Sequence, residues 1–171
     1  MIRGRGQLLS DERGSTLALP PGLEVLERRP DLVIASRGCV MFRLWRATAT
    51  LESLPLCESA LERFSAEHAR YGTLTVVERD LAPPSADVRQ AAGRMMARFM
   101  EQSTNALVIE GTGFKPMAMR LAITTIHLLA PSSTPPLPFG DVKEASEWLA
   151  SQFPDVNAVL LTRDVEILRA L

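Results

Sequence analysis

Hydrophobic residues follow alternately the spacing of strands and the spacing of helices from Gly22 to the end of the chain. Four segments show steps of three and four between apolar positions, which place those side chains on one face of a helix. The third of these helices has few polar positions on any side, so we expect more than one surface to cover it. The predicted helices lie between Thr50 and Arg70, after the N-cap residue Ser85, from Lys115 to Leu129 and from Val142 to Phe153.

Short runs rich in β-branched and apolar residues separate the helical segments and predict strands. Turn signals at Pro30-Asp31 and Arg37-Gly38 divide the first three strands, which we therefore expect to pair antiparallel. The chain ends in a predicted strand, Val156–Thr162, and a short helix, Val165–Leu171. The other predicted strands are Leu23–Arg28, Leu32–Ser36, Cys39–Arg46, Thr73–Glu78 and Asn105–Glu110.

The chain is expected to form one α/β domain. No internal repeat, low-complexity tract or linker divides its 171 residues, and this length suits one packed domain. Glycine, serine and proline near the start are typical of a loose terminus. We therefore expect a flexible N-terminal segment over residues 1–21, an α/β domain over residues 22–153 and a C-terminal extension over residues 154–171.

Four segments, together with the order of the predicted elements, resemble the SpoIIAA-like fold of the STAS family. They are FRLWRATATLESL (Phe42–Leu54), YGTLTVVE (Tyr71–Glu78), LVIEGTGFKPMAMR (Leu107–Arg120) and DVKEASEWL (Asp141–Leu149). The chain looks most like the divergent STAS-like proteins of bacteria. The resemblance implies a single α/β domain with a mixed sheet, an antiparallel N-terminal entry and about four to five helices. The function that it implies is a regulatory module that binds a protein partner.

The same resemblance implies a candidate phosphorylation site. In the regulators of this family, a partner kinase phosphorylates a serine at the start of the helix that follows the strand equivalent to Leu107–Glu110. Here the loop reads Gly111-Thr112-Gly113-Phe114, the Asp-Ser-Ser-Gly pattern is absent, and Thr112 carries the nearest hydroxyl. A phosphate there would lie at a helix N-terminus beside Lys115, an arrangement that favours an anion. The alternative, which we favour, is that the two glycines only permit a tight turn.

Composition and charge disfavour several classes of function. The 19 basic and 20 acidic residues nearly cancel, which argues against a nucleic-acid partner. The N-terminus has no apolar core of signal-peptide length, and no segment has the uninterrupted apolar length of a membrane span, so we expect a cytoplasmic protein. Cys39 and Cys57 lack the clustering of a zinc site or a disulfide framework, and His68 and His127 share no ligand spacing. We expect no metal and no cofactor.

Two glutamates are the candidate carboxylate cluster. Glu78 and Glu110 each end a predicted strand, and the ends of neighbouring parallel strands meet at the edge where α/β folds bind ligands. Asp80 and Lys115 could join them. Such a cluster could support acid–base chemistry in a hydrolase-type enzyme. The alternative is a set of solvated charges, and because no nucleophile with a base accompanies the carboxylates, we expect no catalytic residue.

Methionines and one tryptophan form the candidate interaction surface. Methionine is a flexible, polarisable side chain that serves both in cores and at adaptable binding faces. Met95 falls on the inward stripe of its helix, but Met96, Met100 and Met119 cannot all share such a stripe, and Trp45 alternates away from its apolar strand neighbours. An exposed apolar patch of this kind would mark a protein partner or a homodimer.

Two hypotheses from different classes follow. The leading one is a non-catalytic interaction or regulatory module that self-associates, or binds a protein partner, through its second and third helices. The alternative is a binder of an apolar small molecule or lipid, with its pocket between the third helix and the sheet. A hydrolase-type enzyme that uses Glu78 and Glu110 ranks third.

Overall fold

Three antiparallel strands open the main sheet, as the turn signals predict. In the computed structural model, which describes residues 8–10, 16–99, 101–129 and 136–171, these strands are β3 (Leu23–Arg28), β4 (Leu32–Arg37) and β5 (Val40–Trp45). Gly38 adopts a φ of 51° in the turn between β4 and β5, a backbone conformation that glycine adopts without strain.

Three further strands extend this sheet in parallel. They are β6 (Tyr71–Val77), β7 (Ser103–Ile109) and β8 (Leu137–Phe139), and the sheet order is β3-β4-β5-β6-β7-β8. Pro138 lies on the edge strand β8, where a missing N–H donor is tolerated. The sheet is therefore mixed, and the predicted α/β class is confirmed.

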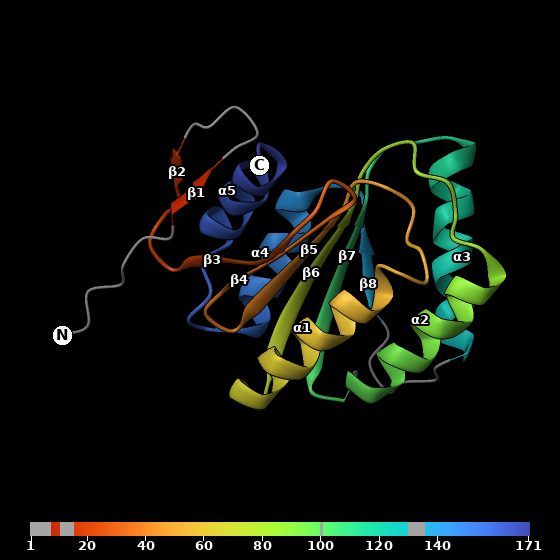
Figure 1. Cartoon of the computed structure of the whole chain (residues 1–171), viewed down its shortest axis with the longest axis horizontal. Coiled ribbons are helices and arrows are strands. Elements are labelled where there is room, and N and C mark those ends of the chain that lie inside the picture. Colours follow the sequence, from red (N-terminus) through yellow and green to blue (C-terminus); the bar gives the residue numbers. More distant parts are fainter. Residues whose placement is uncertain (1–7, 11–15, 100, 130–135) are drawn as a thin grey trace.

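One helix precedes each of these parallel strands, and the three connecting helices lie on the same face of the sheet. The connecting helices are α1 (Leu54–Glu67), α2 (Ala86–Phe99) and α3 (Phe114–Leu129). Right-handed crossovers that add strands in one direction place their helices on one side. In Figure 1, α1 and α2 lie in front of the sheet, and α3 lies beside α2, to the right of β8.

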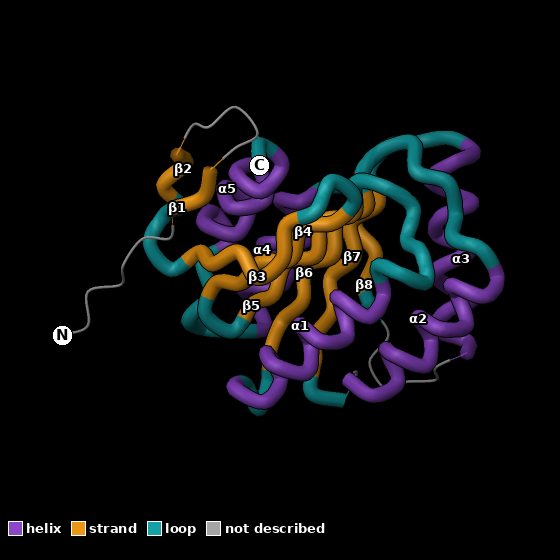
Figure 2. The backbone as a smooth tube through the Cα atoms, in the orientation of Figure 1, coloured by secondary structure: helices purple, strands orange, loops and turns teal. Residues whose placement is uncertain are grey.

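Two helices cover the opposite face. They are α4 (Val142–Gln152) and α5 (Ala158–Arg169), which lie behind the sheet in Figure 2. Asp141 caps α4, because its carboxylate accepts a hydrogen bond of 2.9 Å from the backbone N–H of Glu144. The core on this face is apolar, with Phe42 and Leu74 of the sheet packed in one cluster with Leu149 of α4.

The first helix begins later than the sequence predicts. The predicted range starts at Thr50, but α1 begins at Leu54 and Ser53 occupies the capping position. The two hydroxyl residues bind each other instead: the N–H of Thr50 donates to Ser53 Oγ at 2.9 Å, and the N–H of Ser53 donates to Thr50 Oγ1 at 3.2 Å. Side chains of this type compete with the helix for local backbone groups.

The predicted C-terminal strand Val156–Thr162 is wrong. The structure has one helix there, because Asn157 caps it and accepts hydrogen bonds from the N–H groups of Val159 and Leu160 at 2.9 and 3.2 Å. The apolar residues that suggested a strand follow helical spacing, and they continue into the segment predicted as a short helix. The helix packs into the same core as α4, through Leu161, Val165 and Leu168.

Arg37 on β4 and Arg46 just after β5 hold α5 against the sheet. Both oxygens of the Asp164 carboxylate accept hydrogen bonds from Arg37 of β4, one of them 2.9 Å long, and Asp164 is fully buried. Arg46 donates to the carbonyls of Leu168 and Arg169 at 2.5 and 3.0 Å. Cations at a helix C-terminus interact favourably with its unpaired carbonyls.

Part of the segment 1–21, which the sequence leads us to expect as flexible, forms a small separate sheet. β1 (Leu8–Ser10) and β2 (Thr16–Ala18) pair antiparallel, with Leu8 opposite Ala18. Leu19 then enters the main core with 3% of its surface exposed. Of the helices in the described part of the chain, none combines the length and the hydropathy that crossing a bilayer would require.

Candidate functional site

The two candidate glutamates do meet at the C-terminal edge of the sheet, but around an arginine. Val77 and Ile109 are register partners, so Glu78 and Glu110 leave neighbouring strands side by side. Arg169 of α5 donates to Glu110 at 2.7 Å and lies 3.9 Å from Glu78. Both carboxylates therefore face a permanent cation, and their arrangement joins α5 to the sheet.

The glycine-rich loop behaves as a tight turn. Gly111 and Gly113 have φ angles of 92° and 105°, a region that residues with a side chain rarely adopt. Thr112 between them is exposed. Lys115 lies 3.5 Å from the exposed carboxylate of Asp80, so the cation expected beside a phosphate already has an acidic neighbour. Modification of Thr112 stays a prediction.

The methionines proposed as an exposed interaction surface are wholly or partly buried where the structure describes them. Met119 is 5% exposed, and Met96 is half-buried on α2. Trp45 is also half-buried, and it lies on the face opposite Phe42, as the strand alternation predicts. Met100 lies outside the described residues. The burial of Met119 removes it from any exposed patch, because it faces the sheet instead of solvent.

The exposed apolar residues of α3 are a different set. Met119, Ala122 and Ile126 form its inward stripe. Phe114, Met117 and Leu121 form an outward stripe and are 80%, 62% and 68% exposed. The expectation that more than one surface covers this helix is therefore wrong for the chain alone.

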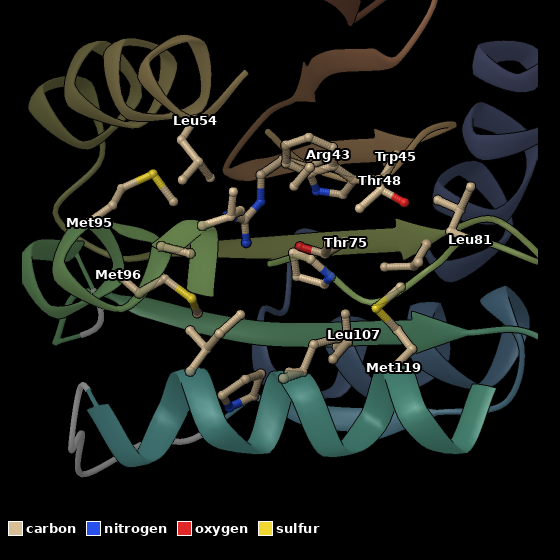
Figure 3. A pocket seen from close by; sticks show the side chains of 18 of the residues that line it. Arg43, Trp45, Thr48, Leu54, Thr75, Leu81, Met95, Met96, Leu107 and Met119 are labelled. Carbon is tan, nitrogen blue, oxygen red and sulfur yellow. The ribbon is translucent and has the colours of Figure 1, made fainter. Parts of the chain in front are cut away.

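An apolar cavity opens between α2, α3 and the sheet, and it collects the buried candidates. Its volume is about 120 Å³. Figure 3 shows the sulfurs of Met95, Met96 and Met119 around it, together with Trp45 and Arg43 from β5. The sheet contributes Arg43, Trp45, Thr75, Val77, Asn105, Ala106 and Leu107; the helices contribute Leu54, Val88, Ala92, Met95, Met96, Met119, Ile123 and Ile126; the loops contribute Ala47, Thr48, Ala49, Leu81, Pro84 and Pro136.

Small side chains leave this space open. On α2, Ala92 lines the cavity between the larger side chains of Val88 and Met95. The loop after β5 contributes two more small residues, Ala47 and Ala49. A closely packed core contains few voids larger than a water molecule. The cavity therefore stands out from the rest of the interior.

Arg43 is a candidate functional residue that sequence analysis did not single out. It lies in the middle of β5, its side chain is on the face covered by α1, α2 and α3, and only 7% of its surface is exposed. Its terminal nitrogen Nη2 donates a long hydrogen bond of 3.4 Å to Thr73 Oγ1, and its buried Nε has no partner among the described residues. Among the residues that line the cavity, Arg43 is the one with a charge.

A signal for this residue was present in the sequence. Arg43 stands between the apolar residues Phe42 and Leu44 inside a predicted strand, a position where a charge is rarely tolerated. Thr75 and Asn105 add polar groups to the next two strands. A row of polar residues across central strands is an exception to an apolar core, and such exceptions occur mostly at functional sites.

Two neighbours of Arg43 carry acidic protons, the Cys57 thiol and the Tyr71 phenol, and burial raises the pKa of both groups further above neutral. It raises the pKa of the Cys57 thiol to about 11, although the charge of Arg43 acts in the opposite direction. Burial also raises the pKa of the Tyr71 phenol. Burial lowers the pKa of Arg43 itself, but a guanidinium stays protonated at neutral pH. Neither neighbour therefore supplies a negative charge to Arg43 near pH 7.

The histidines do not contribute to the cavity as far as the structure describes them. His68 lies at the C-terminal end of α1, where its Nδ1 is 3.0 Å from the carbonyl oxygen of Phe64 and its ring stacks on the Phe64 ring. The side chain of His127 lies outside the described residues. Within the described ranges, no group of three or more His, Cys, Asp or Glu side chains could hold a metal ion.

Comparison with known proteins identifies no relative. No family model matches the chain, and neither the curated proteins nor the solved structures contain a match to it.

Proposed function

We propose that this chain binds a small apolar molecule in the cavity between α2, α3 and the sheet. The cavity itself carries the proposal: about 120 Å³ surrounded mostly by aliphatic, aromatic and methionine side chains. Binding sites for small molecules are concave, mostly apolar, and contain few polar groups that orient the ligand. A dry apolar cavity of about 150 Å³ in another protein is large enough for benzene, so the expected occupant, or its buried part, has that size.

The unfilled space beside the apolar lining supports this function. A ligand that fills the space recovers dispersion contacts that the surrounding side chains otherwise lack. Flexible methionines on two helices can adapt to its shape.

Filling the cavity from within is the direct test. We expect Ala92→Phe to abolish binding of toluene, because the new ring occupies the ligand's space. The readout is the chemical shift of the methionine methyl groups in NMR spectra, where toluene should move the signals of Met95, Met96 and Met119 but not of the exposed Met117. Native mass spectrometry of the purified chain first records any molecule that co-purifies.

The matched control is Ala97→Phe, which places the same ring on the exposed side of α2. It should bind toluene as the unchanged chain does. Toluene binding that persists in Ala92→Phe, or cavity methionines that do not respond to toluene in the unchanged chain, would contradict the proposed function.

One observation favours a second function, the self-associating interaction module expected from the apolar third helix. Phe114, Met117 and Leu121 form an exposed apolar stripe at helical spacing along α3. Contiguous exposed apolar surface is typical of interaction sites, and a symmetric dimer buries the same patch of both copies. We propose that a second copy of the chain covers this stripe.

Solution mass tests this second function. We expect a dimer for the unchanged chain by light scattering after size-exclusion chromatography, and a folded monomer for Leu121→Asp, because a buried unpaired carboxylate opposes association. Thr124→Asp, which adds the same charge at an exposed position of α3, should remain dimeric. A chain that is monomeric at every concentration tested would exclude self-association through α3.

A further inference from the structure

The two faces of the sheet differ in chemistry. The face under α4 and α5 has an apolar core with one buried ion pair at its side, Arg37 with Asp164, whereas the face under α1, α2 and α3 has polar side chains on three adjacent strands. Arg43 of β5 is the register partner of Thr75 on β6, and Thr73 on β6 is the register partner of Asn105 on β7. Buried polar groups lower stability unless they are paired. Packing alone therefore does not explain this row.

Thr73, Asn105 and Ser103 satisfy one another. The hydroxyl of Thr73 donates to Asn105 Oδ1 at 2.6 Å, and Asn105 Nδ2 donates to Ser103 Oγ at 2.9 Å. Thr73 thus uses its proton on Asn105 and offers Arg43 only a long contact of 3.4 Å. The buried Nε of the Arg43 guanidinium is left without an acceptor among the described residues, and the Arg43 side chain lines the cavity.

Arg43 differs in this respect from the other arginines that are at least partly buried. Each of them donates to a carboxylate or to a backbone carbonyl. Arg43 belongs to none of the ion pairs formed by the described residues. The paired arginines are Arg28, Arg37, Arg46, Arg89 and Arg169.

We infer that the cavity binds a small apolar monocarboxylate, whose carboxylate pairs with the guanidinium of Arg43 while its hydrocarbon part lies among Met95, Met96 and Met119. The inference rests on the proposed function and names the chemical class of the ligand. The planar fork of a guanidinium matches a carboxylate with two parallel hydrogen bonds. One cation in the lining calls for one negative charge, and the volume of the cavity limits the hydrocarbon part to about the size of a benzene ring.

Pairs of acids and neutral molecules of matched size test the inference on the unchanged chain. The probes are benzoate against toluene and hexanoate against 1-hexanol, with dissociation constants taken from NMR titration of the methionine methyl groups. We expect each acid to bind at least tenfold more tightly than its neutral counterpart, because a buried unpaired cation gains strongly from an anion in a medium of low dielectric constant.

Two substitutions test whether Arg43 causes the preference for acids over neutral molecules. Arg43→Met should weaken binding of benzoate at least tenfold and change binding of toluene less than threefold. Arg63→Met, the same substitution on the exposed surface of α1, should change neither. The comparison of acid with neutral probe on the unchanged chain keeps the inference testable even where Arg43→Met fails to fold.

The outcomes separate the inference from the proposed function. Toluene and 1-hexanol that bind as tightly as the acids would overturn the inference and leave an apolar binding site in place. Benzoate binding that Arg43→Met does not weaken would overturn it equally. The absence of any shift at the cavity methionines with all four probes would overturn both.

Discussion

Arg37→Met is expected to lower the free energy of unfolding by about 3 kcal/mol. Arg37 is the partner of Asp164, whose carboxylate lies on α5 with none of its surface exposed. Removal of the guanidinium leaves a negative charge buried without a partner, which is the costly form of disruption of such a pair. Urea denaturation followed by circular dichroism measures the effect at the midpoint of the transition.

Two further variants show that the loss comes from the unpaired charge. Arg29→Met breaks an exposed ion pair with Asp31 and should cost less than about 1 kcal/mol. The double variant Arg37→Met with Asp164→Leu removes both charges, and it should recover most of the lost stability. A double variant as unstable as Arg37→Met would show that packing around α5, not the charge, is responsible.

Arg43→Met is expected to act in the opposite direction and to raise the free energy of unfolding of the ligand-free chain by about 1–3 kcal/mol. The substitution removes a buried charge that has no acidic partner and a single long hydrogen bond. Methionine has a similar length and fits an apolar lining. The same urea denaturation, on protein shown by mass spectrometry to carry no ligand, measures the gain.

The two substitutions are expected to change the free energy of unfolding in opposite directions. That difference would distinguish a structural ion pair at Arg37 from a ligand-binding group at Arg43. Residues kept for binding often cost stability, because the site is completed only by its ligand. Addition of benzoate should raise the melting temperature of the unchanged chain and leave that of Arg43→Met unaltered. A loss of stability in ligand-free Arg43→Met would instead assign Arg43 to the core.

The elements of this fold that could be predicted are those encoded locally. The helical spacing of Leu54, Cys57 and Leu61 and the turn signal at Arg37-Gly38 each agree with the structure, because side-chain periodicity and turn chemistry act over a few residues. The C-terminal helix was missed for a local reason too. Its N-cap, Asn157, stands inside a run of apolar residues that also fits a strand.

The candidate site was predictable in part. The pocket between the third helix and the sheet was anticipated as an alternative, and the strand ends bring Glu78 and Glu110 together as expected. The partner of these carboxylates, Arg169, is distant in sequence, so their neutralisation could not be foreseen. Burial of Met119 was equally hidden, because an apolar helix shows several possible inward faces.

The order of strands and helices from β3 to α3 and the α/β class follow from patterns in the chain, since periodicity and turn chemistry belong to short segments. Which face of α3 meets the sheet, where small side chains leave a cavity, and which arginine finds a carboxylate depend on residues far apart in sequence. Arg37 and Arg43 are the same residue type on adjacent strands, yet only Arg37 has a buried carboxylate opposite it. That difference arises from the packing of α5 on one face of the sheet and the open space on the other.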